Sequence, residues 1–488
     1  MVWKAPWIEA KALVVNAAST DRRSQRDRSR DTQSSWPACL RRSGLCRTPV
    51  DLQPQVVTKI ALLDHVGGGN LGDDATLQSV ASSIKRRLPR AEITAFSMNP
   101  DDTQARHGIK SHPIRRSCWA IGYGRAETEV DLKARVKALT HKYHLFYLLK
   151  AVKAVVSLPI ETFRELSFLA SSRRTINSFD ILIISGGGQL TEKDGPWGFP
   201  YTIFKWVVLA RSAGIGCVFL NVGAGPLSQP LSKFFVKRAL LAADYVSLRD
   251  HQSQALVRRI GFGGESQVFP DSAYALEVAT TGDSTRETGC QPIVGLSPMP
   301  YPDPDASGRL AEKNQIVYEA FIRKLASFAS RLVAESHALA LFGTDFGVDP
   351  PAIEDLQRAL SKYHGISSRQ CRVDRPAKSV PDLLAAISGM DYVVTCRFHG
   401  VVFAHLLKKP VLAIAHHPKV ADLMAHLELS SYCVDIRDFD ASLLADKFAS
   451  LVTNTEEIKN RMEMRLTRNR QQLGSQFDCL FGSLKRSI

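Results

Sequence analysis

The sequence of 488 residues lacks two features that would place the protein in a membrane or outside the cell. It has no stretch of about 18 consecutive apolar residues, which argues against a membrane-spanning helix. Its first residues also lack the uninterrupted apolar core of a secretory signal. We therefore predict a cytoplasmic protein, with contact to the inner face of a membrane as an open alternative.

The cysteines form no regular pattern, although there are nine of them. No two have the Cys-x-x-Cys spacing of zinc or redox sites. Cys217 and Cys396 lie inside apolar strand patterns. The sequence therefore predicts buried thiols in a reducing compartment, with neither a disulfide framework nor a zinc site.

Acidic residues are fewer than basic ones, 48 against 63, and the formal net charge is +15. This balance favours anionic partners such as anionic lipids or phosphorylated substrates, although a solvated cationic surface explains it equally well. Residues 1–54 are rich in Arg and Ser and have few large apolar residues after Val15. We predict that this arm is disordered, because it buries too little apolar surface. We expect no specific nucleic-acid partner.

The rest of the chain alternates short apolar strands with helical segments, which predicts an α/β protein with parallel, doubly wound sheets. We predict a first Rossmann-like domain at 55–280, a polar linker at 280–292, a second Rossmann-like domain at 290–440 and a helical segment at 441–488 that crosses back over the first domain. The two domains would face each other across a cleft. Residues 115–178 form a basic helical insertion, and its apolar run from His144 either packs on the domain or lies on a membrane surface.

The first turn contains the glycine spacing of dinucleotide-binding proteins, because Gly67, Gly69 and Gly72 fit G-x-G-x-x-G. The second strand, however, ends in Phe-Ser-Met at 96–98, where an acidic residue should bind the ribose. Asp73 and Asp74 would also repel a pyrophosphate at this helix start. The sequence therefore argues against a nicotinamide cofactor.

The segment 391–417 predicts an anion site. It has an apolar strand at 392–396, a polar turn at 397–399, a short helix at 401–407 and a second strand at 411–415. The turn lies at the carboxyl edge of the sheet, where open α/β folds bind ligands. Arg397 and His399 are two positions apart and can point to one side of an extended chain. Gly400 opens the helix, whose free N–H groups would favour phosphate or carboxylate.

Polar turns of this kind recur along the chain in a fixed order. They contain Asn70, Gly72 and Asp73; glycines 186 to 188; Arg249 and Asp250; Pro270 and Asp271; Arg397, His399 and Gly400; and Lys419. As an ordered set over about 60–435, these residues resemble the polysaccharide pyruvyl transferase family, whose members have the architecture of GT-B-like glycosyltransferases. The basic arm and the long insertion are outside this resemblance.

The resemblance implies that phosphoenolpyruvate is the donor and that a sugar hydroxyl pair, free or on a lipid-linked oligosaccharide, is the acceptor. The product would be a cyclic pyruvate ketal, with phosphate released. On this reading the residues divide into three groups. Arg397, Arg249, Lys419, Phe398 and Gly400 bind the donor; Asn70, Gly72, Gly187, Gly188 and Asp271 line the acceptor side; and His399 and Asp73 act as acid and base.

The residues fit this chemistry independently of the resemblance. Phosphate and carboxylate groups need two or three cations, and Arg can bind either in a bidentate manner. Protonation of the enol methylene needs an acid such as His399, whose pKa a bound phosphate would raise. The adjacent His416 and His417 are expected to be structural, so we predict no metal and no cofactor besides the donor.

Two other functional classes stay open at this stage. A nucleotide-sugar glycosyltransferase shares the architecture and the basic cleft, but no carboxylate is placed for a ribose diol near the end of a helix in the second domain. A non-enzymatic reading makes the chain a basic binding module for nucleic acid or membrane. Small-anion binding distinguishes the first of these, and removal of residues 1–54 the second.

Overall fold

The computed structural model describes residues 57–116, 145–192, 194–278, 291–302, 309–367, 369–373 and 375–487, and within them the side chains outside 145–158, 309–313 and 483–487. The predicted disordered arm, residues 117–144 of the insertion and most of the predicted linker lie outside the described residues.

The N-terminal half is built on a seven-stranded sheet of parallel strands in the order β3-β2-β1-β4-β5-β6-β7. The chain passes through β1 (Lys59–Leu63), α2 (Leu71–Arg87), β2 (Glu92–Ser97), α3 (Pro100–His107), β3 (Ser111–Pro113), α5 (Leu145–Ile176), β4 (Ile181–Ser185), α6 (Phe199–Ser212), β5 (Gly216–Val222), α7 (Pro230–Leu241), β6 (Tyr245–Leu248), α8 (His251–Arg259), β7 (Gln267–Val268) and the 3-10 turn η2 (Ser272–Ala275).

The C-terminal half repeats the same plan with six parallel strands in the order β10-β9-β8-β11-β12-β13. Its elements are β8 (Ile293–Ser297), α9 (Arg309–Ala334), β9 (Ala338–Leu341), α10 (Pro350–His364), β10 (Cys371–Val373), α11 (Val380–Ser388), β11 (Tyr392–Thr395), α12 (Phe398–Leu406), β12 (Val411–Ala415), α13 (Pro418–His426), the 3-10 turn η3 (Ser430–Tyr432) and β13 (Cys433–Asp435). The predicted fold class, an α/β protein with two Rossmann-like doubly wound sheets, is confirmed.

Each sheet reverses its winding once, and these switch points determine where a ligand can bind. The reversal falls between β1 and β4 in the first sheet and between β8 and β11 in the second. Ligands of open α/β folds bind outside the carboxyl ends of the strands at such points. The turn after β1 and the turn after β11, which lie at these points, are both among the turns that the sequence predicts as binding turns.

The central strands are apolar on both sides because helices cover both faces of the sheets. In β4, for example, all five residues are buried. One face of the first sheet packs with α2 and η2, and the other packs with α6, α7 and α8. None of the helices in the described part of the chain has the length and apolar character needed to cross a membrane.

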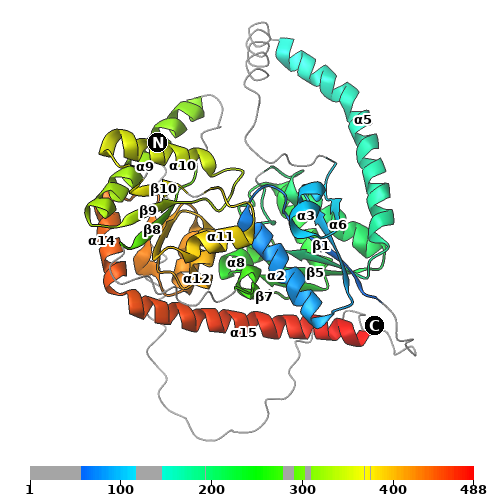
Figure 1. Cartoon of the computed structure of the whole chain (residues 1–488). Helices are drawn as coiled ribbons and strands as arrows, with labels where there is room; N and C mark the ends of the chain where they lie inside the picture. The colour runs from blue at the N-terminus through cyan, green and yellow to red at the C-terminus, as the bar shows by residue number, and fades with distance from the viewer. Residues whose placement is uncertain are drawn as a thin grey trace, which may run out of the picture.

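The chain ends in α14 (Ala441–Thr453) and the long α15 (Thr455–Ser487), which runs beneath both halves (Figure 1). α15 contacts α12 of the second half and α2 and η2 of the first. Its Gln476 is buried and exchanges hydrogen bonds with Asn221, at 2.9 Å in each direction. The prediction that the C-terminal helical segment crosses back over the first domain is therefore confirmed.

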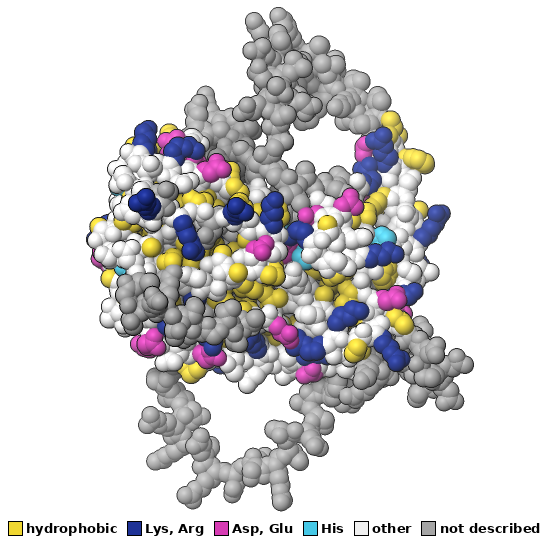
Figure 2. Space-filling model, in the orientation of Figure 1, with side chains coloured by type: hydrophobic (Ala, Val, Ile, Leu, Met, Phe, Trp, Pro, Cys, Tyr) yellow, Lys and Arg dark blue, Asp and Glu magenta, His cyan; other side chains and the backbone are white. Residues whose placement is uncertain are grey.

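Charged side chains of both signs are spread over the face of the molecule drawn in Figure 2. Lys and Arg side chains occur on both halves, with Asp and Glu between them. The net positive charge is therefore not gathered into one basic patch on this face.

Candidate active site

The turns after β1 and β9 join the two halves directly. The Leu71 amide donates to the Thr344 carbonyl at 3.0 Å, and the Phe346 amide donates to the Gly69 carbonyl at 3.0 Å. Asn70 and Asp345 form an antiparallel bridge between these bonds. The first turn of α2 is thereby held against the second half of the molecule.

Gly72 brings α2 into contact with the imidazole of His399. Asn70 caps α2, accepting a hydrogen bond from the Gly72 amide at 3.0 Å. A Cβ on Gly72 would overlap the His399 ring, so only glycine permits this approach. The predicted acid of the second half therefore lies directly against the N-terminus of α2 in the first half.

Asp271 connects the predicted arginine of the first half with the predicted histidine of the second. Its Oδ2 accepts a hydrogen bond from Nη1 of Arg249 at 3.3 Å and lies 3.8 Å from Nε2 of His399. The Arg249 guanidinium lies over the Phe398 ring, 4.4 Å from its centroid. The structure thus brings Arg249, Asp271, Phe398 and His399 together from the two sheets.

Two buried nitrogen atoms of this cluster have no hydrogen-bond partner among the described residues, namely Nε of Arg249 and Nε2 of His399. A buried polar group without a hydrogen bond is costly, and both groups belong to residues that contact Asp271, although Nε of Arg249 also lies 3.5 Å from Oδ2 of Asp250. They indicate a place for a ligand that accepts hydrogen bonds. Gly223 contributes to the close packing here, since a Cβ on it would lie 2.5 Å from Nε of Arg249.

Asp73 and Lys419 belong to the same electrostatic neighbourhood. Burial raises the pKa of Asp73 to about 6, against the opposing effects of His399, Arg249 and Lys419. Burial, and then the charge of Arg249, lower the pKa of Lys419 to about 8. Both groups are therefore set to change charge within two pH units of neutrality.

The surroundings of His399 favour its neutral form. Burial lowers the pKa of this imidazole, and the positive charges of Arg249 and Lys419 act in the same direction, while Asp271 and Asp73 oppose them. Since a negative charge would favour the imidazolium, an anion bound at this place would raise the pKa of His399.

The structure corrects the prediction that Arg397 and His399 point to one side of an extended turn. α12 begins at Phe398, so His399 lies inside the first turn of the helix, while Arg397 is its N-cap in extended conformation. Arg397 turns away and donates from Nε to Oδ1 of Asp349 at 3.0 Å, with a second bond from Nη2. The reason is the fully buried Asp349, which needs a cation.

Arg397 therefore stabilises the turn after β9. The other oxygen of Asp349 accepts hydrogen bonds from the amides of Thr344 and Asp345, both at 3.0 Å. This is the turn that bonds to Gly69 and Leu71 of the first half. Sequence reasoning missed Asp345 and Asp349, although the polar segment GTDFGVD after an apolar strand carries the same signal as the turns it included.

Gly400 does not open the helix, although the sequence predicts that it does. The helix begins two residues before it, and a Cβ on Gly400 would overlap the side chain of Thr395. Thr395 in turn accepts a hydrogen bond from the Arg397 amide at 3.2 Å. Gly400 thus allows α12 to pack closely on the end of β11.

The glycines after β4 lie beside Asp73. Gly186 and Gly187 have φ angles of 74° and 48°, in the region that favours glycine. A Cβ on Gly187 would lie 2.9 Å from Oδ1 of Asp73, whereas Gly188 faces open space. The structure thus places Gly187, a predicted acceptor-side residue, next to the predicted base, with Gly188 following it in the chain.

His65, directly after β1, is a further residue that sequence reasoning did not single out. Its Nδ1 lies 3.6 Å from Oδ2 of Asp73, and its ring packs edge-on against Phe199. Its position at the end of an apolar strand was the signal that could have found it.

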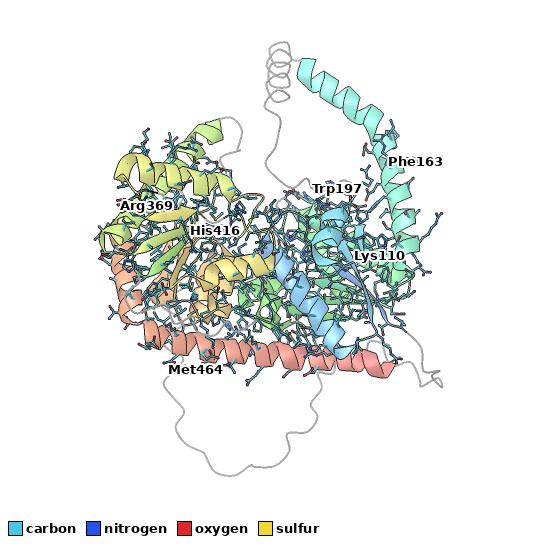
Figure 3. The ribbon with its side chains drawn as sticks, in the orientation of Figure 1. Lys110, Phe163, Trp197, Arg369, His416 and Met464 are labelled. Carbon is cyan, nitrogen blue, oxygen red and sulfur yellow. The ribbon has the colours of Figure 1, made fainter. Side chains whose placement is uncertain are left out.

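The histidine pair after β12 has local partners. Nδ1 of His416, which Figure 3 labels, is 2.8 Å from the Cys396 carbonyl, and His417 caps α13 by accepting from the Lys419 amide. Burial lowers the pKa of His416 to about 4. The described residues contain no group of three His, Cys, Asp or Glu side chains arranged to hold a metal ion.

Comparison with known proteins gives one family and one type of fold. A family model described as polysaccharide pyruvyl transferase matches residues 70–418. Among solved structures, Anabaena Alr3699/HepE in complex with UDP superposes with a TM-score of 0.51 and 14% identity over 88% of this chain and 100% of that one. An S. aureus MnaA–UDP structure gives 0.49 and 12% over 83% and 90% of the two chains, and E. coli ADP-heptose lps heptosyltransferase II gives 0.40 and 14% over 82% and 100%. The likeness to Alr3699/HepE shows the fold, and the predicted GT-B-like architecture is confirmed.

Proposed function

The chain belongs to the polysaccharide pyruvyl transferase family, and we propose that it moves the pyruvyl group of phosphoenolpyruvate onto two hydroxyls of a saccharide acceptor. The product is a cyclic ketal, and inorganic phosphate is released. The observation that carries this proposal is the contact of Asp271 with both Arg249 and His399, which joins a cation of one half to an acid of the other.

The cations of the site suit the donor. Phosphoenolpyruvate carries a carboxylate and a phosphate. Nε of the Arg249 guanidinium has no hydrogen-bond partner in the described part of the chain, although it lies 3.5 Å from Oδ2 of Asp250, and it offers a charge-assisted hydrogen bond to either group. Lys419 supplies a second positive charge while it is protonated. Arg397 acts through Asp349, by holding the turn that closes over the N-terminus of α2.

The proposed reaction begins with proton transfer from Nε2 of His399 to the methylene carbon of the donor. The adjacent carbon becomes electrophilic, and an acceptor hydroxyl attacks it while Asp73 accepts the hydroxyl proton. The bond between this carbon and the phosphate oxygen then breaks, phosphate leaves, and the second hydroxyl closes the ketal ring. Its proton leaves with phosphate as hydrogen phosphate, and the proton held by Asp73 returns the imidazole to its charged form.

The donor itself would prepare His399 for this role. Burial lowers the pKa of this imidazole and so favours its neutral form, but the negative charges of bound phosphoenolpyruvate would raise that pKa. Proton uptake would then accompany donor binding. The acceptor would enter beside Asp73, on the side of Gly188, where an added Cβ would meet nothing within 4 Å.

Phosphate release from phosphoenolpyruvate in the presence of saccharide acceptors tests the proposal. We expect release that depends on the acceptor and falls by a factor of about 100 or more in His399→Gln, as for loss of a general acid. A shift in melting temperature with phosphoenolpyruvate and none with uridine diphosphate would agree with this. Stabilisation by nucleoside diphosphates alone would instead indicate a glycosyltransferase.

A further inference from the structure

The outer faces of α6 and α7 expose large apolar side chains that the fold does not use. Trp197, which precedes α6, is 67% exposed, and Phe234 and Leu241 of α7 are 47% and 48% exposed. With the other apolar residues of these faces they form what we call the α6–α7 surface: Trp197, Phe204, Val208, Leu231, Phe234 and Leu241.

Ring contacts connect the aromatic side chains of this surface across the two helices. Phe204 of α6 is 6.2 Å from Phe234 of α7, measured between ring centroids. Trp197 is connected to them through a core residue, the buried Phe235, which lies 5.7 Å from Trp197 and 5.1 Å from Phe204.

The spacing on α7 places the apolar and basic side chains on one stripe. Leu231, Phe234, Arg238 and Leu241 follow one another at intervals of three or four residues, which is one face of a helix. The opposite face supplies Phe235, Val236, Ala239 and Leu240 to the core. The exposed stripe is thus additional to the face that holds the helix on the sheet.

The charge of these two helices has one sign. Neither α6 nor α7 contains an Asp or Glu, and together they carry five basic residues: Lys205, Arg211, Lys233, Lys237 and Arg238. Lys205 is buried against Glu165, but Arg238 is exposed and lies over the Phe234 ring at 5.6 Å. Apolar side chains bordered by cations are the composition of helices that lie in the plane of an anionic membrane.

We propose that the α6–α7 surface binds the surface of a bilayer that contains anionic lipids. Electrostatic complementarity favours this occupant over a second copy of the chain, since a symmetric pair would bring two helices without a single acidic residue against each other. The neighbouring α5, which packs on α6, adds the exposed Ile160, Phe163 and Leu166. Phe163 and Trp197 lie toward the same end of the N-terminal half (Figure 3).

The position of this surface predicts what kind of molecule carries the acceptor saccharide. This prediction rests on the proposed function. Trp197 belongs to the segment that leads from Gly186–Gly188 to α6, and Gly187 lies against Asp73. A protein seated on a bilayer through α6 and α7 would hold the acceptor side of its site close to the headgroups. The acceptor would then be a saccharide carried by a lipid.

Cosedimentation of the full-length protein with vesicles tests the surface without donor or acceptor, so its result is independent of the catalytic proposal. We expect binding to phosphatidylcholine vesicles that contain phosphatidylglycerol, and much weaker binding to phosphatidylcholine alone. Lys233→Gln with Arg238→Gln should weaken binding by about 25-fold, about fivefold for each charge. Phe234→Ser should weaken it by about tenfold or more.

Met464→Ser is the matched control, since Met464 is 65% exposed on α15, away from α6 and α7 (Figure 3). It should leave vesicle binding unchanged, and the melting temperature of each variant shows that it folds. Failure to bind either vesicle, or binding that the α6–α7 variants leave intact, would overturn the proposal. So would a dimer in light scattering that Phe234→Ser dissociates, in a protein that binds no vesicles.

Discussion

Among single residues, Gly72 shows most directly how the two halves depend on each other, because a methyl group there would enter the ring of His399. We predict that Gly72→Ala displaces the imidazole, lowers kcat/KM by about 100-fold as expected for a misplacement near 1 Å, and costs about 1–3 kcal/mol of stability. Phosphate release and thermal melting measure the two effects. Gly474→Ala, on a helix and facing open space, should leave activity unchanged and the melting temperature equal or slightly higher.

The titration of Asp73 and Lys419 gives a second prediction at the scale of residues. As a base, Asp73 must be ionised, so kcat/KM should rise with pH through its pKa of about 6. Lys419 must be protonated to bind the donor, so kcat/KM should fall through its pKa of about 8. His399 must also take up a proton for the proposed reaction, and burial lowers its pKa. The kcat/KM for acceptor-dependent phosphate release should therefore rise on the acid side with Asp73 and fall in two steps, through His399 and then through Lys419.

Two substitutions separate these limbs from the titration of the donor itself, whose phosphate also ionises near pH 6. Lys419→Arg keeps the charge at all pH values and should remove the part of the alkaline fall near pH 8, leaving the part due to His399. Asp73→Asn should lower the rate throughout and leave only the donor's own acid limb. A Lys419→Arg profile that falls as steeply above pH 8 as that of the unsubstituted protein would assign this part to another group.

Among the elements, α15 is joined to the first sheet by a buried polar network. Nε2 of Gln476 donates to the side chains of Asn221, Tyr245 and Ser247 at 2.9–3.0 Å. We predict that Gln476→Ala lowers the free energy of unfolding by about 2–3 kcal/mol, because it leaves buried polar groups without partners. Gln472→Ala, exposed on the same helix, should change it by less than about 0.5 kcal/mol in urea denaturation.

The sequence predicts elements better than it predicts contacts between them. The strands and their polar ends can be predicted because each is a short apolar run followed by a turn, and Gly72, Arg249, Asp271 and His399 were found in this way. From R-F-H-G the sequence predicts a helix that opens at Gly400, but α12 begins at Phe398. The glycine is there because α12 packs closely on Thr395, a contact that the local sequence does not show. The pairing of Arg397 with Asp349 joins residues 48 positions apart, and no local pattern encodes it.

At the scale of the whole molecule, the site exists only while the turn after β1 stays bonded to the turn after β9. Gly347 permits this contact, because a Cβ on it would lie 2.8 Å from the Gly68 carbonyl oxygen. We predict that Gly347→Ala separates the two turns while both sheets stay folded. The Leu71 and Phe346 amides, which donate across the contact, should then exchange hydrogen faster. The expected increase is about 10-fold for each 1.4 kcal/mol by which the substitution destabilises the contact between the two turns.

Gly347→Ala also distinguishes loss of the contact between the two turns from loss of stability of the two sheets. Strand amides of β4 and β11 should keep their protection in Gly347→Ala, and kcat/KM should fall, because His399 and Asp73 come from opposite halves and must meet for the proposed reaction. Gly263→Ala is the control, since a Cβ there meets nothing within 4 Å. If Gly347→Ala exposed the Leu71 and Phe346 amides without loss of activity, the reaction would require the residues of only one half, and the joint site would be wrong.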